Sequence, residues 1–156
     1  MSAAGYHLAQ FNIGKMIAPL DDPRIASFVE QLEPINALAD SSPGFVWRLQ
    51  SEEGDATALR VFDDPDILVN MSVWESLAAL REFVYRSEHR ELLRARANWF
   101  VKSEGPHLVL WWIPAGSQPT VEEAKQKLAL LQAHGPTEQA FDFRHSFAPP
   151  ATQQAG

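Results

Sequence analysis

The segment Ile67–Phe100 constrains the fold most strongly, because it passes from the period of a strand to that of a helix with no linker between them. Up to Trp74 the side chains alternate between two faces, as successive residues of a strand do. One face takes Ile67, Val69, Met71 and Val73, and the other takes Leu68, Asn70, Ser72 and Trp74. From Glu75-Ser76 the pattern is helical, and we expect a helix to about Phe100 that would break, if anywhere, near Arg86-Ser87.

The rest of the chain repeats this alternation of strands and helices. Strands are predicted at Tyr6–Met16, Phe45–Ser51 and His107–Pro114. The last is apolar enough to be buried on both faces. In the first, Ala9, Phe11 and Ile13 share one face and Leu8, Gln10 and Asn12 the other. Two less regular strands are expected, at Ala56–Phe62 in a hairpin and at Phe141–Phe147 along an edge.

Capping residues mark where helices begin and end. Asp21-Asp22-Pro23 predicts a helix start, and Pro34 is expected to kink that helix before it ends at Ser41-Ser42-Pro43-Gly44. Thr120-Val121-Glu122-Glu123 has the pattern of a capping box, so a second helix should begin there and stop at Gly135-Pro136.

The order β-α-β-β-α-β followed by a helix predicts an α+β fold of the ferredoxin-like split βαβ type. Helices in such a fold cover one face of the sheet. We expect the other face to carry Asn70, Ser72 and Trp74 with Trp47 or Arg48, and to be covered by a second copy. Two sheets packed face to face would make a dimeric α+β barrel, hence a homodimer. Residues 1–147 are expected to form this single domain and residues 148–156 a disordered tail.

Composition excludes several classes of function. The 156 residues include no cysteine, so disulfides, thiolate metal ligands and a cysteine nucleophile are ruled out. Thirteen basic residues against twenty acidic ones give a net charge of −7, which argues against a nucleic-acid partner held by phosphate contacts. The sequence shows no stretch of about 20 apolar residues and no secretion signal. We therefore expect a cytoplasmic protein with no membrane partner.

His89 is the side chain best suited to chemistry. Helical spacing places it on one face with Tyr85, Arg96 and Phe100, while Arg86 belongs to a separate ridge. Imidazole titrates near neutral pH and serves as a general base or as a haem ligand. The plainer interpretation, a core histidine hydrogen-bonded to Tyr85 or to an amide, is equally open. Arg86 and Arg96 would clamp a carboxylate or a haem propionate, or would simply be solvated.

Amides and large aromatic residues are the other candidates. Gln10, Asn12 and Asn70 lie on strands beside Trp74, and a few convergent polar groups among apolar walls are typical of a small-molecule pocket. Trp47, Arg48, Phe83 and Trp99 are further candidates for contact with a substrate. Each of the aromatic residues is as readily explained as core. The remaining histidines are isolated, and no metal site is predicted.

Several blocks of this sequence resemble one bacterial family, the domain of unknown function 3291, over about Tyr6–Arg144. The blocks are LAQFNIG, GFVWRLQ, NMSVWESLAALREFVYRSEHRELLRARANWF, LVLWWIPAG, PTVEEAKQKL and HGPTEQAFDFR. The family in turn resembles the dimeric α+β barrel superfamily, which includes antibiotic-biosynthesis monooxygenases, haem-degrading monooxygenases, chlorite dismutases and spheroidene monooxygenases. The resemblance implies a dimeric α+β barrel; a fold does not by itself fix a function.

The resemblance reaches individual residues. Asn70-x-x-x-Trp74 is similar to the Asn/Trp pair of cofactor-independent quinone-forming monooxygenases, although the tyrosine that follows there falls on Leu80 here. Phe83 occupies the place of the second tryptophan of haem-degrading members. Phe83-Val84-Tyr85 followed by His89 is most similar to a stretch of the haem-containing spheroidene monooxygenases.

Two functional hypotheses follow. The first is a monooxygenase-like oxidoreductase that acts on a hydrophobic aromatic or polyene molecule, either with haem or with no cofactor. In it His89, Asn70, Trp74 and Tyr85 would be catalytic. The second is a non-catalytic dimer that binds a hydrophobic small molecule or haem.

Overall fold

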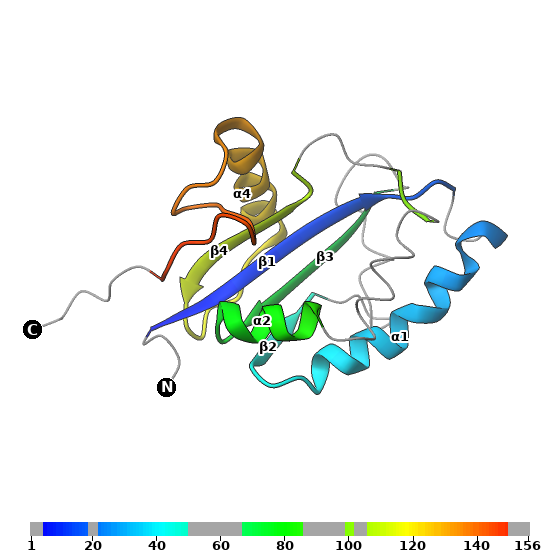
Figure 1. Ribbon diagram of the computed structural model, residues 1–156, viewed down its shortest axis with the longest axis horizontal. Helices are drawn as coiled ribbons and strands as arrows, with labels where there is room; N and C mark the ends of the chain where they lie inside the picture. The colour runs from blue at the N-terminus through cyan, green and yellow to red at the C-terminus, as the bar shows by residue number, and fades with distance from the viewer. Residues whose placement is uncertain (1–4, 19–21, 50–66, 86–98, 102–105, 150–156) are drawn as a thin grey trace, which may run out of the picture.

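A computed structural model describes residues 5–18, 22–49, 67–85, 99–101 and 106–149. Its strands are β1 (Tyr6–Lys15), β2 (Phe45–Arg48), β3 (Ile67–Trp74) and β4 (Leu108–Pro114). They form one antiparallel sheet in the order β2-β3-β1-β4 (Figure 1). The helices are η1 (Pro23–Ile25), α1 (Ala26–Asp40), α2 (Leu77–Val84) and α4 (Val121–His134). This strand order with these connections is the predicted ferredoxin-like α+β fold. Within the described ranges, no helix has the length and apolarity that crossing a membrane requires.

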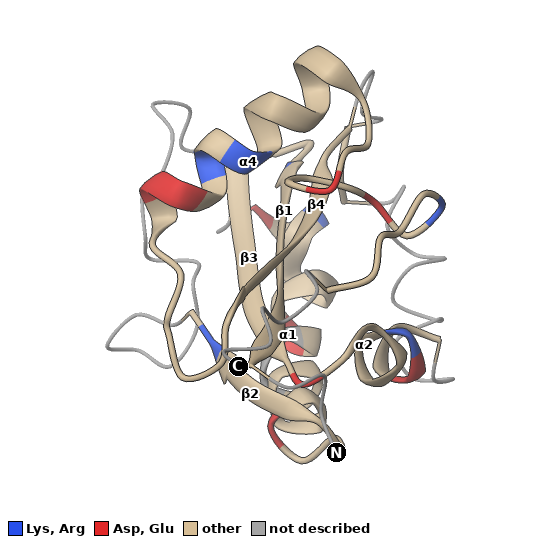
Figure 2. Ribbon diagram, turned by 90° about the vertical axis from the view of Figure 1, so that its left-hand side faces the viewer, with Lys and Arg blue, Asp and Glu red and all other residues tan. Residues whose placement is uncertain are grey.

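The alternation predicted for β1 is confirmed and divides the core in two. Ala9, Phe11 and Ile13 pack with apolar residues of β3 and β4 against the buried side of α4. We call this side of the sheet the α4 face. The helix contributes Ala124, Leu128 and Leu131 to it. Figure 1 shows α4 behind the sheet and α2 in front of it, and Figure 2 shows the same separation from the side.

The opposite side, which we call the site face, carries Leu8, Gln10 and Asn12 of β1 and, through the antiparallel register, Trp74, Ser72 and Asn70 of β3. Leu8 and Trp74 pack there with Ala39 of α1 and with Leu80 and Phe83 of α2. The prediction that this face is bare was wrong. Helices cover both faces: α1 and α2 lie over the site face, and α4 covers the face that a two-helix version of this fold would leave open.

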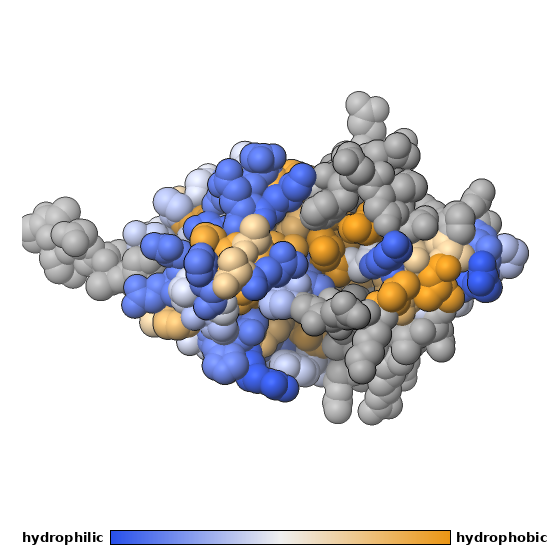
Figure 3. Space-filling view, turned by 90° about the horizontal axis from the view of Figure 1, so that it is seen from above, coloured by the Kyte–Doolittle hydropathy of each residue, from blue (hydrophilic) through white to orange (hydrophobic). Residues whose placement is uncertain are grey.

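A second apolar cluster lies at the other end of the site face. Met16, Ala18, Ile25 and Trp99 form it, together with Leu68 of β3 and Phe28 of α1. The ring of Phe28 lies 5.5 Å from that of Trp99 and 5.1 Å from that of Phe100. Apolar side chains also reach the surface near this end, where Ile17 and Val101 are exposed. Figure 3 shows this apolar surface in orange at the end of the molecule where α1 begins.

Both caps predicted from the sequence form, and the first of them caps the short helix η1 that leads into α1. Asp22 accepts a hydrogen bond from the Arg24 backbone N–H and caps η1, which leads into α1; α1 then continues through Pro34 to Asp40. Thr120 accepts from the backbone N–H of Glu123 and caps α4, which ends before Gly135. Glu122 and Glu123 place negative charge in the first turn of α4, where the helix dipole favours it.

Helix α2 ends close to the break expected near Arg86-Ser87. Ser76 caps α2 by accepting from the Ala79 backbone N–H, and the helix ends at Val84. The rest of the predicted helix, residues 86–98, lies outside the described residues, and Phe100 itself pairs with Met16 in an isolated bridge instead of ending a helix. Hydrophobic periodicity could not reveal this, because the strand-like pairing of Phe100 depends on a residue near the other end of the chain.

The C-terminal part of the chain passes from α4 to the other side of the sheet. Phe141 exchanges two backbone hydrogen bonds with Leu110 of β4, at 2.7 and 2.9 Å. This bridge is the short edge pairing predicted for Phe141–Phe147, reduced to a single residue. Phe141, Phe143 and Phe147 pack into the cluster of the site face, and the Trp112 indole donates to the Phe147 carbonyl at 2.9 Å. The predicted strand Ala56–Phe62 lies outside the described residues.

Candidate functional site

Four polar side chains stand side by side in the middle of the site face. Gln10 lies opposite Ser72, and Asn12 lies opposite Asn70, in the pairing of β1 with β3. We call these four residues the polar row. The apolar clusters of the site face lie at its two ends: Leu8 and Trp74 follow Gln10 and Ser72 on one side, and Leu68 follows Asn70 on the other. The polar row therefore interrupts an otherwise apolar face.

Helix α1 connects the two clusters. It contributes Phe28 to one and Ile35, Leu38 and Ala39 to the other. Its 15 residues span about 22 Å at 1.5 Å per residue. The eight steps of β1 from Leu8 to Met16 span about 26 Å. Helix α1 and the strand therefore extend over about the same distance. The polar row lies between the two apolar clusters at their ends.

Hydrogen bonds join the polar row into one network. The Gln10 Nε2 donates to Asn70 Oδ1 at 2.5 Å and to Ser72 Oγ at 3.0 Å, while Gln10 Oε1 accepts from Asn12 Nδ2 at 2.8 Å. Asn12 Nδ2 also approaches Asn70 Oδ1 at 3.4 Å. All the amide hydrogens of Gln10 are therefore used inside the row, which a side chain only 4% exposed requires.

The network opens toward solvent at one end. Gln10 and Ser72 are buried, Asn12 is half-buried and Asn70 is exposed. Because Asn70 Oδ1 accepts within the row, the Nδ2 of that amide is directed away from it. The half-buried Leu68 and Leu108 flank the open end on the neighbouring strand positions. An amide donor between apolar side chains suits an oxygen atom of a largely apolar ligand.

Trp74 is a buried residue next to the polar row. Its Nε1 donates to Ser72 Oγ at 2.9 Å, its ring stacks on Phe83 at 5.1 Å, and Phe45 meets it edge-on at 5.5 Å. The residue is 1% exposed. Its polar atom is satisfied and its ring is covered, so in this conformation Trp74 supports the polar row through Ser72 rather than presenting its own surface.

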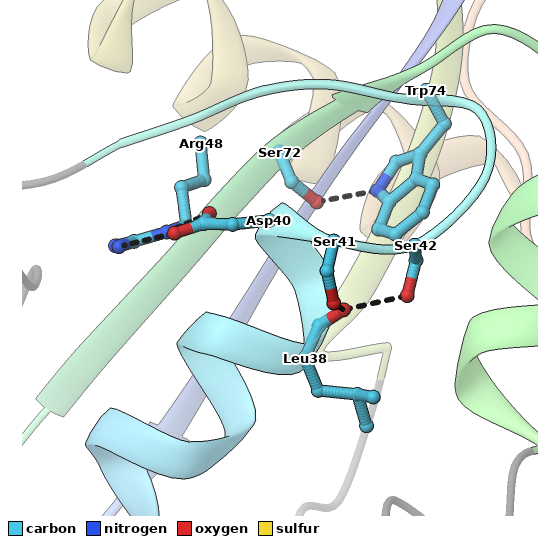
Figure 4. Close-up of polar contacts among 7 residues, drawn as sticks. All are labelled: Leu38, Asp40, Ser41, Ser42, Arg48, Ser72 and Trp74. Carbon is cyan, nitrogen blue, oxygen red and sulfur yellow. Dashed lines mark hydrogen bonds and ion pairs between the residues drawn. The ribbon is translucent and has the colours of Figure 1, made fainter.

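Arg48 borders the polar row on the side of β2, opposite Ser72. Its guanidinium makes two hydrogen bonds to the carboxylate of Asp40, with Nε–Oδ1 at 2.8 Å and Nη2–Oδ2 at 3.3 Å (Figure 4). The Arg48 side chain is only 13% exposed. Since Asp40 is the last residue of α1, a bidentate pair here fixes the C-terminal end of that helix to the sheet.

The other aromatic candidates are distributed over the molecule. Phe83 stacks on Trp74 in the cluster at one end of the site face. Trp99 lies in the cluster at the far end, where its Nε1 donates to Ser27 Oγ at 2.8 Å. Trp47 packs on the α4 face, so the structure does not bring it together with Trp74. Tyr85 ends α2 as its capping residue and is 59% exposed, so its predicted inward orientation was wrong. The helical period that placed it inward stops one residue earlier.

The proposed haem ligands cannot be located from the fold, because His89, Arg86 and Arg96 lie outside the described residues. Among the residues that are described, no three His, Asp or Glu side chains come close enough to hold a metal ion. The site as described consists of amides, one hydroxyl, one indole and the Arg48–Asp40 pair.

Ser72 and Asp40 are the site residues that the candidate set omitted. Ser72 joins Gln10 to Trp74, and Asp40 holds Arg48. The alternation in β3 already put Ser72 on the face of Asn70 and Trp74, so a buried hydroxyl between an amide and an indole was the signal. Nothing in the local sequence ties Asp40 to Arg48, since a turn separates them.

Comparison with solved structures found proteins of low sequence identity. A candidate antibiotic biosynthesis monooxygenase from Nitrosomonas europaea is 13% identical, with 75% of this chain and 95% of that chain covered and a TM-score of 0.47. SnoaB, a cofactor-independent oxygenase from Streptomyces nogalater, is 15% identical, with coverages of 75% and 97% and a TM-score of 0.42. A conserved protein from Methanosarcina mazei is 11% identical, with coverages of 69% and 90% and a TM-score of 0.46. A search among curated proteins found no match.

These structural alignments have TM-scores below 0.5, so the assignment of the fold depends on the strand order and connections described above. The family assignment depends on the sequence, because a single family model matches almost the whole chain. The protein belongs to the family described as Domain of unknown function (DUF3291), whose model matches residues 7–155.

Proposed function

We propose that the open end of the polar row binds an oxygen atom of a hydrophobic aromatic or polyene small molecule, and that the protein is a monooxygenase-like oxidoreductase. The observation that carries the proposal is the orientation of Asn70. Its Oδ1 accepts from Gln10, it is exposed, and the end of the row that it shares with Asn12 is bordered by Leu68 on β3 and Leu108 on β4. An amide in this position donates to a carbonyl or hydroxyl oxygen of a ligand whose rings rest on Leu68 and Leu108.

The same donor supports oxidation without a cofactor. A fixed N–H group beside a substrate hydroxyl stabilises the oxyanion that forms when the hydroxyl loses its proton. Such an electron-rich anion can itself reduce dioxygen. Overall, one ring methylene group and one dioxygen molecule become a ring carbonyl group and one water molecule, and the substrate supplies all four electrons. His89 is our proposed base, since imidazole is suited to taking this proton near neutral pH.

Turnover of hydroxyaromatic compounds tests this function. We expect the wild-type protein to consume dioxygen with 1,8-dihydroxyanthrone or 1-naphthol. Asn70→Ala should lower kcat about 100- to 1,000-fold, as the loss of one oxyanion donor does. Gln132→Ala, which changes an exposed amide of α4, is the control and should leave kcat unchanged. Equal rates for wild type and Asn70→Ala across the panel would exclude this role for the site.

The alternative is a protein that binds the same kind of molecule without turnover, and the burial of Trp74 and Ser72 favours it. Neither side chain presents a reactive atom to a ligand in this conformation. Thermal stabilisation by the hydroxyaromatic probes, lost in Asn70→Ala, combined with no dioxygen consumption would support binding alone.

Haem binding is a separate part of the proposal and involves His89, Arg86 and Arg96. Bound haem would supply redox chemistry, and no step here is assigned to it. Purified protein titrated with hemin should develop a Soret band that His89→Ala shifts or removes. A spectrum unchanged by His89→Ala would eliminate His89 as the axial ligand.

The predicted homodimer needs contacts other than those first expected. The expected contact was between two site faces, and each site face is packed against α1 and α2 of its own chain. Two such faces can pair only if these helices move. We therefore propose a dimer that leaves α1 and α2 in place, and sedimentation velocity measures whether it exists.

A further inference from the structure

The donor that Asn70 presents is set by a side chain that no ligand touches. Gln10 is buried in the middle of the row and uses all of its hydrogen-bonding groups there: two N–H groups donate, to Asn70 and Ser72, and its oxygen accepts from Asn12. An apolar residue would fill this strand position without the desolvation that a buried amide costs. Packing alone therefore does not explain why residue 10 is a glutamine.

The hydrogen bonds of the network have one direction, which is set at Gln10. An indole N–H can only donate, so Ser72 Oγ is an acceptor toward Trp74, at 2.9 Å. Ser72 Oγ accepts a second hydrogen bond from Gln10 Nε2. With its nitrogen committed to Ser72 and Asn70, Gln10 has only its oxygen left for Asn12. Each amide in the row is then fixed in one of its two orientations.

We propose that Gln10 is a positioning residue whose amide orientation makes Asn70 a hydrogen-bond donor at the open end of the row and so selects ligands that accept there. The connection runs from Gln10 to Asn70, with Ser72 as the other acceptor of the Gln10 amide nitrogen. Its use in ligand choice rests on the proposed function, whereas the orientation of the amides is a property of the protein without a ligand.

Replacing the Gln10 amide with a group that can only accept hydrogen bonds should reverse the orientation of the Asn70 amide. A carboxylate can only accept, so Gln10→Glu still accepts from Asn12 but has no hydrogen for Asn70 Oδ1. The Asn70 amide then gains by turning over, so that its Nδ2 donates inward and its Oδ1 points to solvent. Ser72 keeps its bond from Trp74 and donates its own hydrogen to the carboxylate. Gln132→Glu, the same substitution at an exposed amide, is the matched control.

Nuclear magnetic resonance on the protein without ligand tests the orientation directly. Gln10→Met and Asn70→Asp identify the two side-chain amide signals by their disappearance. In the wild type the Gln10 amide hydrogens should exchange with water at least tenfold more slowly than those of Asn70. In Gln10→Glu at pH 8 the Asn70 amide hydrogens should become protected, and in Gln132→Glu they should stay exposed. A protected Asn70 amide in the wild type, or one that Gln10→Glu leaves unchanged, would overturn the proposal.

Two probes of similar size test the consequence for ligands. 1-Tetralone only accepts hydrogen bonds, and indole only donates them. We expect the wild type to bind 1-tetralone more tightly, and Gln10→Glu to shift the ratio of the two Kd values about three- to tenfold toward indole, the effect of one hydrogen bond. If neither probe binds the wild type, the proposed function fails while the exchange data still decide the orientation. If both bind and the ratio is unchanged, Gln10 does not select the ligand.

Discussion

At the scale of single residues, the polar row shows how a few hydrogen bonds hold polar groups inside an apolar face. Gln10 and Ser72 are buried, yet the amide nitrogen and oxygen of Gln10 and the hydroxyl oxygen of Ser72 all have hydrogen-bond partners. These hydrogen bonds stabilise the fold mainly by avoiding a penalty. A buried donor without a partner costs more free energy than a typical hydrogen bond adds.

Ser72→Ala tests this directly. The substitution leaves the Trp74 indole and one Gln10 N–H buried without their shared acceptor, so we expect the free energy of unfolding to fall by about 2–4 kcal/mol. Urea unfolding followed by tryptophan fluorescence measures it. The control is Ser41→Ala, which removes an exposed hydroxyl that donates to the Leu38 carbonyl (Figure 4) and should change stability by less than about 0.5 kcal/mol. Similar losses for both variants would contradict the role given to Ser72.

The surface pair of Asp22 and Arg24 predicts a small pH effect. The pKa of Asp22 lies below its ordinary value, first because the Arg24 side chain donates to its carboxylate and next because the Arg24 backbone N–H does so. A lowered pKa in the folded state stabilises the protein above the unfolded value of about 3.9, and this contribution is lost as the pH falls through the folded pKa. Arg24→Gln should raise the Asp22 pKa in a carbon-detected titration. Arg144→Gln, an exposed arginine of the C-terminal segment, should leave that pKa unchanged.

At the scale of secondary-structure elements, the turn into β2 lies so close to α2 that a side chain at Gly44 would not fit. Gly44 has φ +83° and leads into β2, and a Cβ there would come within 2.4 Å of the Ala79 Cβ in α2. The Gly44 carbonyl accepts from the Glu75 backbone N–H at 2.7 Å, which holds the turn against the start of that helix. Glycine is needed here both for its backbone conformation and for its lack of a side chain.

Comparing two glycines separates these effects. Gly44→Ala should destabilise the protein by about 2–4 kcal/mol, the sum of a strained φ and a steric clash. Gly116→Ala, where φ is +88° and a Cβ would meet no described atom within 4 Å, should show only the backbone effect of about 1–2 kcal/mol. Thermal unfolding of both variants measures the difference. Equal losses would mean that the contact with Ala79 relaxes without cost.

The elements themselves were largely predictable, because their signals are local. The alternation of Ala9 and Phe11 with Gln10 and Asn12 fixed the two faces of β1, and Thr120 with Glu123 marked the start of α4. What local patterns could not decide was which helix covers which face. That choice depends on the connection from β4 into α4, which carries the chain to the side opposite α1 and α2. The placement of Trp47 has a different cause: an irregularity between Phe45 and Trp47 pairs Trp47 with Val73 and so leaves Arg48, the other residue considered, on the site face.

At the scale of the whole molecule, two helical layers enclose one sheet. Helices α1 and α2 cover the site face, and α4 covers the opposite face with Ala124, Leu128 and Leu131. The Trp111 indole donates across that interface to the Glu123 carboxylate at 2.9 Å. The polar row therefore lies on the side of the sheet against which α1 and α2 pack.

Loss of packing under α4 should destabilise the molecule as a whole. Leu128→Ala should lower the free energy of unfolding by about 2–5 kcal/mol, as large-to-small changes in a well-packed core do. Gln126→Ala, on the exposed side of the same helix, should change it by less than about 0.5 kcal/mol. Urea unfolding and sedimentation velocity on both variants test this. A small effect of Leu128→Ala would mean that the α4 face is closed by something other than α4.

The passage of the chain from α4 to Phe141 and Phe147 has a consequence for biosynthesis. Each face of the sheet is completed by residues after Val121: the α4 face by the helix itself, and the site face by the phenylalanines that follow it. As the ribosome releases the chain, the strands emerge with both apolar faces still incomplete. We therefore expect stable folding to wait until the segment through Phe147 has left the exit tunnel, and until then the nascent strands expose apolar surface of the kind that promotes association.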